Sequence, residues 1–376
     1  MATDATPPVN SDTAEDEARR QLPAETFEYA SGGAGDGSTV RRNIARLDSL
    51  SLLPRMLRDV SRIDMGTDVV GGRLAAPFLV APMGMQSIYH EGAESAAATA
   101  AAQLGLGFCL STFASHSPKE VAGAAGRQVR WRQVYLMSDS GLTDALVEGA
   151  EDAGFDAVVC TVDVPVMGAS RRDAGNVFDH SSQELRQAAS QPAVADEPCF
   201  TRLLAERRRE TPGASAQEVI DTLFPNPAAT WKELERLIAR CRLPVIVKGV
   251  LHPEDATRAI EAGAAAVVVS NHGGYQHDRS VTSIDALPGV AGAVGGRVPV
   301  YFDSGIRRGS HAAVALARGA SAVLVGRPVL WGLAVGGRDG VAAVLRDLVE
   351  DLHNTMAIVG APTVADLAGV VTTVAD

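Results

Sequence analysis

The stretch AAVVVSNHGG at residues 265–274 begins with an apolar run and ends with a histidine between an asparagine and two glycines. The run AAVVVS (265–270) shows no alternation of polar and apolar residues, which is typical of a strand buried on both faces of a parallel sheet. Similar runs recur along the chain, and most are separated by segments with helical spacing such as HPEDATRAIEAG (252–263). The other runs are FLVAP (78–82), GFCLS (107–111), WRQVYL (131–136), AVVCTVD (157–163), PVIVKG (244–249), PVYFD (299–303) and AVLVG (322–326).

Eight such strand–helix units predict an α/β fold of the (β/α)8 class, the TIM barrel. A doubly wound open sheet is the alternative, and it is disfavoured because no GxGxxG follows an early strand. Residues 17–376 are expected to form this single domain, and residues 1–16 a flexible, polar lead-in. Before the first strand, residues 17–77 predict helices and a small hairpin, VVGGRLAAP (69–77), which closes the bottom of the barrel.

One interval breaks the repeat. About 80 residues separate the fourth run from the fifth, far more than a βα connection usually needs. The middle of this interval, about 175–230, is polar and mixed in composition. In a barrel it leaves from the C-terminal face, where active sites lie, so we expect a lid that is partly helical and partly mobile.

The bulk properties exclude several classes of protein. The net charge of −11 argues against a nucleic-acid partner or an anionic membrane surface. No apolar run is long enough to span a bilayer, and the N-terminus lacks the basic and apolar regions of a signal peptide. The 4 cysteines have no metal-binding spacing and predict reduced thiols. We therefore expect a cytoplasmic protein that binds a small molecule and no metal.

Polar residues gather where the predicted strands end, and a packed core would not need them there. Because the carboxyl ends of barrel strands meet at one mouth, these residues predict a common site. They are Gln133, Tyr135, Thr161, Asp163, Lys248, Ser270, Asn271, His272, Asp303, Gly326 and Arg327.

The loops after the last two strands predict a phosphate site. DSGIRRG (303–309) and GRP (326–328) are glycine-rich turns with arginines, at the usual phosphate-binding place of this fold. Backbone N–H groups from Gly305, together with Arg307 and Arg327, could hold a phosphate dianion. Two surface turns with solvated arginines are the alternative interpretation.

Two further residue types suit redox and proton chemistry. Lys248 ends a buried strand, so its charge must be compensated, and beside a flavin it would stabilise the reduced ring. His272 and Asp163 end different strands and could pair, which would fix the imidazole tautomer and raise its basicity. A barrel-layer salt bridge and a structural histidine are the simpler interpretations of Lys248 and His272.

Taken together, these motifs resemble the family of FMN-dependent α-hydroxy acid oxidases and dehydrogenases. The resemblance runs from about YASGGAGD (29–36) to the C-terminus, with the family motifs in order. They are APMGMQSIYHEGAE (81–94), QVY (133–135), TVDVP (161–165), VKG (247–249), SNHGG (270–274), DSGIRRG and GRP.

The resemblance implies a cofactor, FMN, and a role for each matching residue. His272 would take the proton of the substrate hydroxyl, Asp163 would steady the imidazolium, and Tyr135 would hydrogen-bond the substrate oxygen. Lys248 would lie against the flavin, with Asp303 near its ribityl chain. The further cofactor-binding residues implied are Ala81, Pro82, Met83, Ser111, Gln133, Thr161, Ser270, Gly305, Arg307, Gly326 and Arg327. The resemblance also implies molecular oxygen or another electron acceptor, and a homo-oligomer, by resemblance a tetramer.

This sequence departs from the family pattern where the substrate carboxylate would bind. Tyr275 stands where the family has one carboxylate-binding arginine, and an ungapped alignment puts Ser170 at the second. Arg171 or Arg172 could replace the second arginine only if the loop shifts. The alignment also puts Glu28 at the position of an active-site tyrosine, and Gly84 where the family packs a small side chain above the flavin.

Loss of bidentate arginine contacts should cost several kcal/mol of carboxylate binding. We therefore expect oxidation of a CH–OH or CH–NH₂ carbon beside a neutral group, in specialised metabolism, where Glu28 could recognise an amine and Tyr275 could contact a ring. The alternatives are an ordinary 2-hydroxy acid oxidase or a lactate 2-monooxygenase-like enzyme that uses Arg171 or Arg172, and an FMN-binding protein without this redox activity, such as an isomerase.

Overall fold

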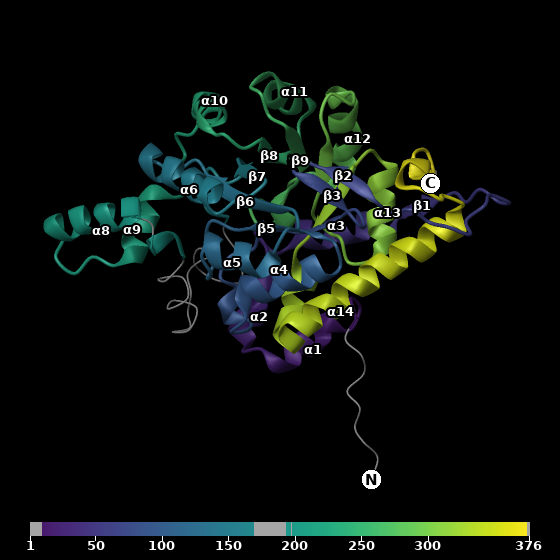
Figure 1. The fold of residues 1–376 in the computed structure, drawn as a ribbon, viewed down its shortest axis with the longest axis horizontal. Coiled ribbons are helices and arrows are strands. Elements are labelled where there is room, and N and C mark those ends of the chain that lie inside the picture. The colour runs from purple at the N-terminus through teal and green to yellow at the C-terminus, as the bar shows by residue number, and fades with distance from the viewer. Residues whose placement is uncertain (1–9, 169–192, 197, 374–376) are drawn as a thin grey trace, which may run out of the picture.

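A closed barrel of eight parallel strands forms the centre of the protein, and helices surround it (Figure 1). A computed structural model describes residues 10–168, 193–196 and 198–373. The prediction of a (β/α)8 barrel is confirmed. Around the barrel the strands follow the order β10 (Val300–Phe302), β11 (Ala322–Val325), β4 (Phe78–Val80), β5 (Gly107–Leu110), β6 (Arg130–Tyr135), β7 (Ala157–Thr161), β8 (Val245–Val250) and β9 (Ala266–Val269).

The interior of the barrel is filled by side chains from alternate strand positions. Trp131 and Tyr301 are fully buried there, with ring centroids 5.0 Å apart. Their polar atoms meet a hairpin made of β2 (Thr67–Val69) and β3 (Gly72–Leu74), because Trp131 donates to the Val70 carbonyl and the Val70 N–H donates to Tyr301. The hairpin therefore closes the N-terminal end of the barrel, as the sequence predicts.

Each strand leads into an outer helix, apart from the long connection after β7. The apolar faces of these helices cover the outer faces of the strands, so the strands are buried on both sides. The outer helices are α4 (Ala93–Gln103), α5 (Pro118–Ala125), α6 (Ser140–Asp152), α10 (Trp231–Arg240), α11 (Pro253–Glu261), α12 (Ser283–Val294), α13 (Gly309–Ala317) and α14 (Arg327–Val359). None of the helices in the described ranges is both long and apolar enough for a membrane span.

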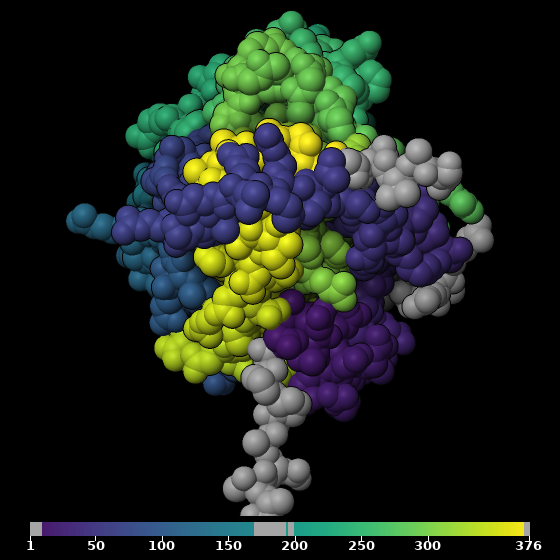
Figure 2. Space-filling model, turned by 90° about the vertical axis from the view of Figure 1, so that its right-hand side faces the viewer, coloured from purple at the N-terminus to yellow at the C-terminus, as the bar shows by residue number. Residues whose placement is uncertain are grey.

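The N-terminal segment is helical and packs against the end of the chain. It contains α1 (Ala14–Gln21), α2 (Ala24–Ser31), α3 (Ser38–Asp48) and β1 (Leu50–Leu52), which pairs with β12 (Val371–Thr373). Figure 2 shows the N-terminal helices, in purple, beside the long yellow-green α14.

The boundary predicted for the flexible lead-in, residues 1–16, is wrong in its last part. Helix α1 begins at Ala14, and Ala14 and Ala18 lie one helical turn apart, both fully buried in the packing against α14. Ser11 donates to the carboxylate of Asp347 on α14, which ties down the residues just before the helix. Residues 1–9 lie outside the described range.

The predicted lid, about 175–230, is partly helical where the structure describes it. It contains a short 3-10 helix at Ala193–Asp196, α8 (Pro198–Glu210) and α9 (Ala216–Leu223), and α8 and α9 extend to the left of the barrel in Figure 1. The end of the segment is anchored, because Ser138 N–H donates to the Leu223 carbonyl and Asn226 to the Met137 carbonyl. Phe224 thereby reaches the barrel mouth.

We predict opposite effects on stability for two Gly→Ala substitutions. A Cβ at Gly309, the first residue of α13, would overlap the Leu352 amide and the Leu348 carbonyl of α14, so Gly309→Ala should cost about 1–3 kcal/mol. Gly123 lies exposed in α5 with nothing within 4 Å, so Gly123→Ala should stabilise by about 0.5–1 kcal/mol. Urea unfolding measures both, and a Gly309→Ala protein as stable as Gly123→Ala would contradict the close approach of α13 and α14.

Candidate functional site

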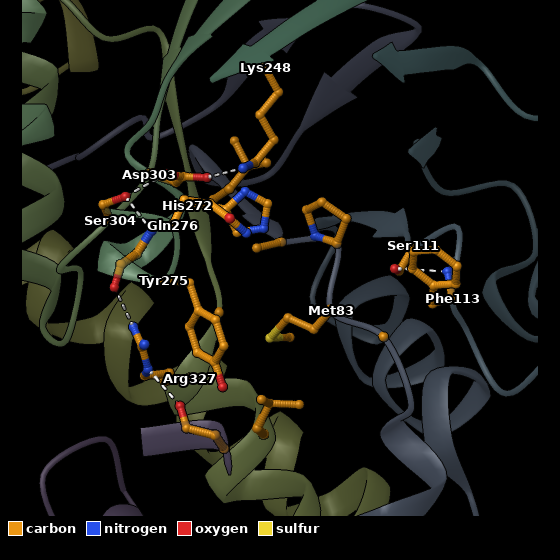
Figure 3. Close-up of a pocket in the computed structure, with 18 of the residues that line it drawn as sticks. Met83, Ser111, Phe113, Lys248, His272, Tyr275, Gln276, Asp303, Ser304 and Arg327 are labelled. Carbon is orange, nitrogen blue, oxygen red and sulfur yellow. Dashed lines mark hydrogen bonds and ion pairs between the residues drawn. The ribbon is translucent and has the colours of Figure 1, made fainter. Parts of the chain in front are cut away.

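A cavity opens at the C-terminal mouth of the barrel, and most of the predicted site residues line it (Figure 3). Ser270, Asp163 and Thr161 lie beside it, each in contact or in register with a lining residue, and Gln133 lies two residues before the lining Tyr135 on β6. The predicted residues that line the cavity are Ala81, Pro82, Met83, Gly84, Ser111, Tyr135, Lys248, His272, Tyr275, Asp303, Gly305, Arg307, Gly326 and Arg327.

His272 and Asp163 form the predicted pair, with 2.9 Å between His272 Nδ1 and Asp163 Oδ1. Burial alone would raise the pKa of Asp163, but the electrostatic interactions with His272 and with the Lys248 cation, together with the hydrogen bond to His272, outweigh burial and lower that pKa. Gly249 makes room for this carboxylate: its φ is +107°, and a Cβ there would lie 2.6 Å from the Asp163 Cβ. His272 Nε2 is left free of Asp163 and can accept a proton.

Lys248 forms a second buried pair with Asp303. The distance from Lys248 Nζ to Asp303 Oδ2 is 3.2 Å, and Lys248 Nζ also donates to Ser270 Oγ at 3.0 Å. Burial disfavours the ammonium charge, but Asp303 and Asp163 outweigh it and raise the pKa of Lys248. A cation therefore persists at the floor of the cavity, where it would stabilise negative charge on a reduced flavin.

Unpaired polar atoms at the mouth fit the polar edge of a flavin ring. Gln133 Nε2 and Thr161 Oγ1 are buried and have no hydrogen-bond partner among the described residues. The other end of the Gln133 amide is fixed, because its Oε1 accepts from the Thr112 N–H at 2.9 Å. Buried donors without partners are rare in proteins, so these atoms indicate a ligand with matching polar groups.

The arginines of the last two turns fit a phosphate group. Burial, and then repulsion from Arg327, lower the pKa of Arg307 to about 10. Within the described ranges, neither Arg307 nor Arg327 forms an ion pair with a carboxylate, so two half-buried cations lie near each other without an anion. The N-terminus of α14 begins at Arg327, which adds backbone N–H donors. The residues present therefore fit FMN.

Four of the 5 tyrosines of the chain line this cavity: Tyr29, Tyr89, Tyr135 and Tyr275. Burial raises the pKa of Tyr29 and Tyr89 well above the usual range, and burial followed by the Asp163 charge raises the pKa of Tyr135. The phenol groups of these three tyrosines therefore stay neutral. Tyr275 donates its hydroxyl to the Tyr29 carbonyl, and the Arg327 guanidinium lies 5.5 Å from its ring centroid.

The placement predicted for Glu28 is corrected by the structure. Glu28 is exposed on α2 and does not line the cavity, whereas its neighbour Tyr29 does. Successive side chains on a helix diverge by about 100°, so only one of the two can face the mouth. A tyrosine is therefore present where the alignment had put an acid. Ser170, Arg171 and Arg172 lie outside the described residues.

The sequence analysis missed an aromatic wall. Phe113, Tyr135 and Phe224 pack together, with ring centroids 4.2 Å apart for Tyr135 and Phe224 and 5.2 Å apart for Phe113 and Phe224. Gly84 lies against this wall, because a Cβ there would come within 2.9 Å of the Phe113 carbonyl oxygen. Phe113 could have been predicted, because it follows the predicted site residue Ser111 by two positions at the end of a strand. No sequence signal marked Phe224, which lies inside the polar insertion.

Comparison with known proteins gives consistent matches over nearly the whole chain. The profile of the FMN-dependent dehydrogenase family matches residues 18–373. L-lactate oxidase of Nostoc sp. is 42% identical over 366 residues, 96% of each chain. 4-Hydroxymandelate oxidase of Amycolatopsis orientalis is 40% identical over 347 residues, 92% of this chain and 93% of the relative. A solved structure of an arginine-to-leucine variant of mandelate oxidase with 2-hydroxy-phenylacetamide has a TM-score of 0.81 at 37% identity, covering 97% of this chain and 98% of that one.

We predict that Gln133→Glu weakens FMN binding without loss of folding. Glutamate keeps the acceptor for the Thr112 N–H but removes the unpaired amide donor, so FMN affinity should fall about 10- to 100-fold, the equivalent of one buried hydrogen bond. Quenching of FMN fluorescence on titration into apoprotein measures the dissociation constant. Unchanged affinity would mean that Gln133 Nε2 does not face the cofactor.

We also predict an acid-dependent contribution of Asp163 to stability. Its pKa is lowered on folding, so this contribution is complete above the unfolded aspartate pKa of about 3.9 and is lost as the pH falls through the lower folded value. Asp163→Asn should therefore cost most near neutral pH, and its difference from the wild type should shrink below about pH 4. Urea unfolding from about pH 7 to about pH 3 tests this, and a pH-independent difference would contradict it.

Proposed function

Because the chain belongs to the family of FMN-dependent dehydrogenases and is an FMN-dependent oxidoreductase of the α-hydroxy acid oxidase type, we propose that its substrate is an aromatic compound with a neutral group beside the oxidised carbon. That carbon carries a hydroxyl or an amine, and the neighbouring group is an amide, ester, ketone or ring. The observation that carries the proposal is Tyr275, a neutral side chain at a position where a carboxylate would need a cation.

The neutral lining of the cavity supports this choice of substrate. A buried carboxylate costs several kcal/mol unless a cation pairs with it. In this proposal Arg327 serves the phosphate, and its Nε, Nη1 and Nη2 also donate to the carbonyls of Ala30, Gly273 and Gly32, which leaves it unavailable to a substrate carboxylate. In Figure 3 the ring of Tyr275 lies between Arg327 and Met83, on the side of the cavity. Phenol hydroxyls can instead hydrogen-bond a neutral carbonyl.

The aromatic wall supports an aryl substituent on the substrate. The rings of Phe113, Tyr135 and Phe224 offer faces and edges for an added aromatic ring, which gains both burial and ring–ring contact. The mandelate oxidase variant with 2-hydroxy-phenylacetamide, described above, also lacks one arginine and has an aryl amide, so it is a precedent for this pairing of changes.

The reaction assigned to the site begins with proton transfer. His272 Nε2 accepts the proton of the substrate hydroxyl, Asp163 holds the Nδ1–H and stabilises the imidazolium, and Tyr135 hydrogen-bonds the substrate oxygen. FMN, when bound, would accept the hydrogen of the C–H bond together with its two electrons, as a hydride. Lys248 remains charged because Asp303 and Asp163 hold its pKa high. Molecular oxygen or another acceptor then takes the electrons. In this proposal the protein acts in the cytoplasm and forms a homo-oligomer.

An ordinary 2-hydroxy acid oxidase is the second candidate, and the names of the two curated relatives favour it. In that case Arg171 or Arg172 would bind the substrate carboxylate in place of Ser170. The two candidates make opposite predictions for an acid and its matching amide.

We predict that 2-hydroxy-phenylacetamide bleaches the bound flavin faster than mandelate does, and that Tyr275→Arg reverses this order. The arginine would restore a cation for the carboxylate, which should raise the rate of flavin reduction by mandelate about tenfold or more. Anaerobic stopped-flow mixing measures both rates. Tyr275→Phe is the matched control: it keeps the ring and adds no charge, so the order of substrates should stay unchanged.

Faster bleaching by mandelate in the wild-type protein would instead establish the second candidate. His272→Gln should lower flavin reduction by about 10²- to 10⁴-fold for every substrate while FMN stays bound, because it removes the base. Flavin reduction at the wild-type rate by the His272→Gln variant would contradict the proton-transfer role of His272.

A further inference from the structure

Serine hydroxyls hold the backbone around His272. The N–H of Asn271 donates to Ser283 Oγ at 2.9 Å, and the N–H of His272 donates to Ser270 Oγ at 3.1 Å. The N–H of Gly273 donates to Ser304 Oγ at 3.0 Å, and the N–H of Asn271 makes a longer contact with the same oxygen at 3.4 Å. The N–H groups on both sides of His272 thus reach Ser304.

Ser304 occupies a backbone conformation that favours glycine. Its φ is +85°, and the φ of His272 is +56°, so both residues lie in the left-handed region. A non-glycine residue in this region stores strain that its surroundings must offset. The hydroxyl offers that compensation, because it accepts from the Gly273 N–H and donates to Asp303 Oδ1 at 2.8 Å. Figure 3 shows Ser304 beside Asp303, facing the His272 segment.

The Ser304 hydroxyl therefore joins two parts of the catalytic machinery. Asp303 pairs with Lys248, and the Gly273 N–H belongs to the turn that aims the His272 ring at Asp163. Glycine at position 304 would relieve the backbone strain, so stability alone does not account for a serine. We propose that Ser304 is a positioning residue for His272, whose hydroxyl holds the 271–273 backbone so that the imidazole meets Asp163. This inference rests on the proposed role of His272 as the base.

The test separates the hydroxyl from the strain with two variants. Ser304→Gly removes both, and Ser304→Ala removes only the hydroxyl. The substrate for this test is 2-hydroxy-phenylacetamide or mandelate, whichever reduces the wild-type flavin faster. Both variants should lower the rate of flavin reduction by about 10- to 100-fold, because a small misplacement of a base has an effect of this size. Ser304→Gly should melt at or above the wild-type temperature and Ser304→Ala below it. The FMN dissociation constant should stay within about threefold in both.

A surface residue gives the matched control for added glycine. Leu57 is exposed, and its φ is +58°. Leu57→Gly relieves similar strain at a residue that does not line the cavity, so the rate of flavin reduction in this variant should equal that of the wild type.

A double-mutant cycle shows whether Ser304 acts through His272. In a His272→Gln background, Ser304→Gly should change the residual reduction rate by less than about twofold, because the base it positions is gone. A crystal structure of Ser304→Gly should show a His272 Nδ1–Asp163 Oδ1 distance longer than the 2.9 Å of the wild type.

Three outcomes would overturn the inference: equal losses of rate in both backgrounds, an unchanged His272–Asp163 contact, or a loss of FMN affinity that accounts for the slower reduction. Failure of the proposed role of His272 as the base is distinct from these outcomes, since it appears in the His272→Gln variant alone as an undiminished rate of flavin reduction.

Discussion

The side chain of Lys248 is only 4% exposed near the end of β8, and a buried cation costs several kcal/mol unless it is paired. Asp303, from the end of β10, forms an ion pair with Lys248. Asp163, from the end of β7, also stabilises the ammonium through its negative charge. Each carboxylate also forms a hydrogen bond with a further group. Asp163 pairs with the His272 ring, and Asp303 accepts from the Ser304 hydroxyl. The arrangement of the mouth follows from the neutralisation of this one charge.

The N-terminal segment completes the site, although it is far from His272 in the sequence. Asn43 and Asn271 exchange two buried hydrogen bonds of 2.8 Å, and the Ala34 N–H donates to the Gly274 carbonyl. Arg327 ties the same turn to the end of α2 through three carbonyl groups. Barrel strands alone therefore do not fix the His272 turn, because several of its hydrogen bonds are made with residues that precede the first strand.

The barrel and the strand-end residues could be predicted because both depend on local patterns. Apolar runs indicate strands buried on two faces. A polar residue at the carboxyl end of such a run, such as Lys248 or Asp163, is expected to lie at the mouth of the barrel. Glu28 was misplaced because an ungapped alignment has no information on helix phase, and one residue on α2 turns a side chain from the mouth to the solvent. Phe224 could not be found, because its position depends on how the insertion folds back. The packing of α1 was missed because two alanines give little apolar signal.

The distribution of positive charge links Tyr275 to the chemistry of the substrate. Arg307 and Arg327 already lie close enough for repulsion to contribute to the lowered pKa of Arg307, and the residues around them fit one phosphate anion. An arginine at position 275 would add a third guanidinium beside Arg327, and only an anionic substrate could offset it. A tyrosine there places an aromatic ring near the Arg327 guanidinium, which is favourable and adds no charge. A neutral substrate, as proposed, would match the neutral Tyr275, because a carboxylate without a cation, or a cation without a carboxylate, would leave an unpaired charge in a buried site.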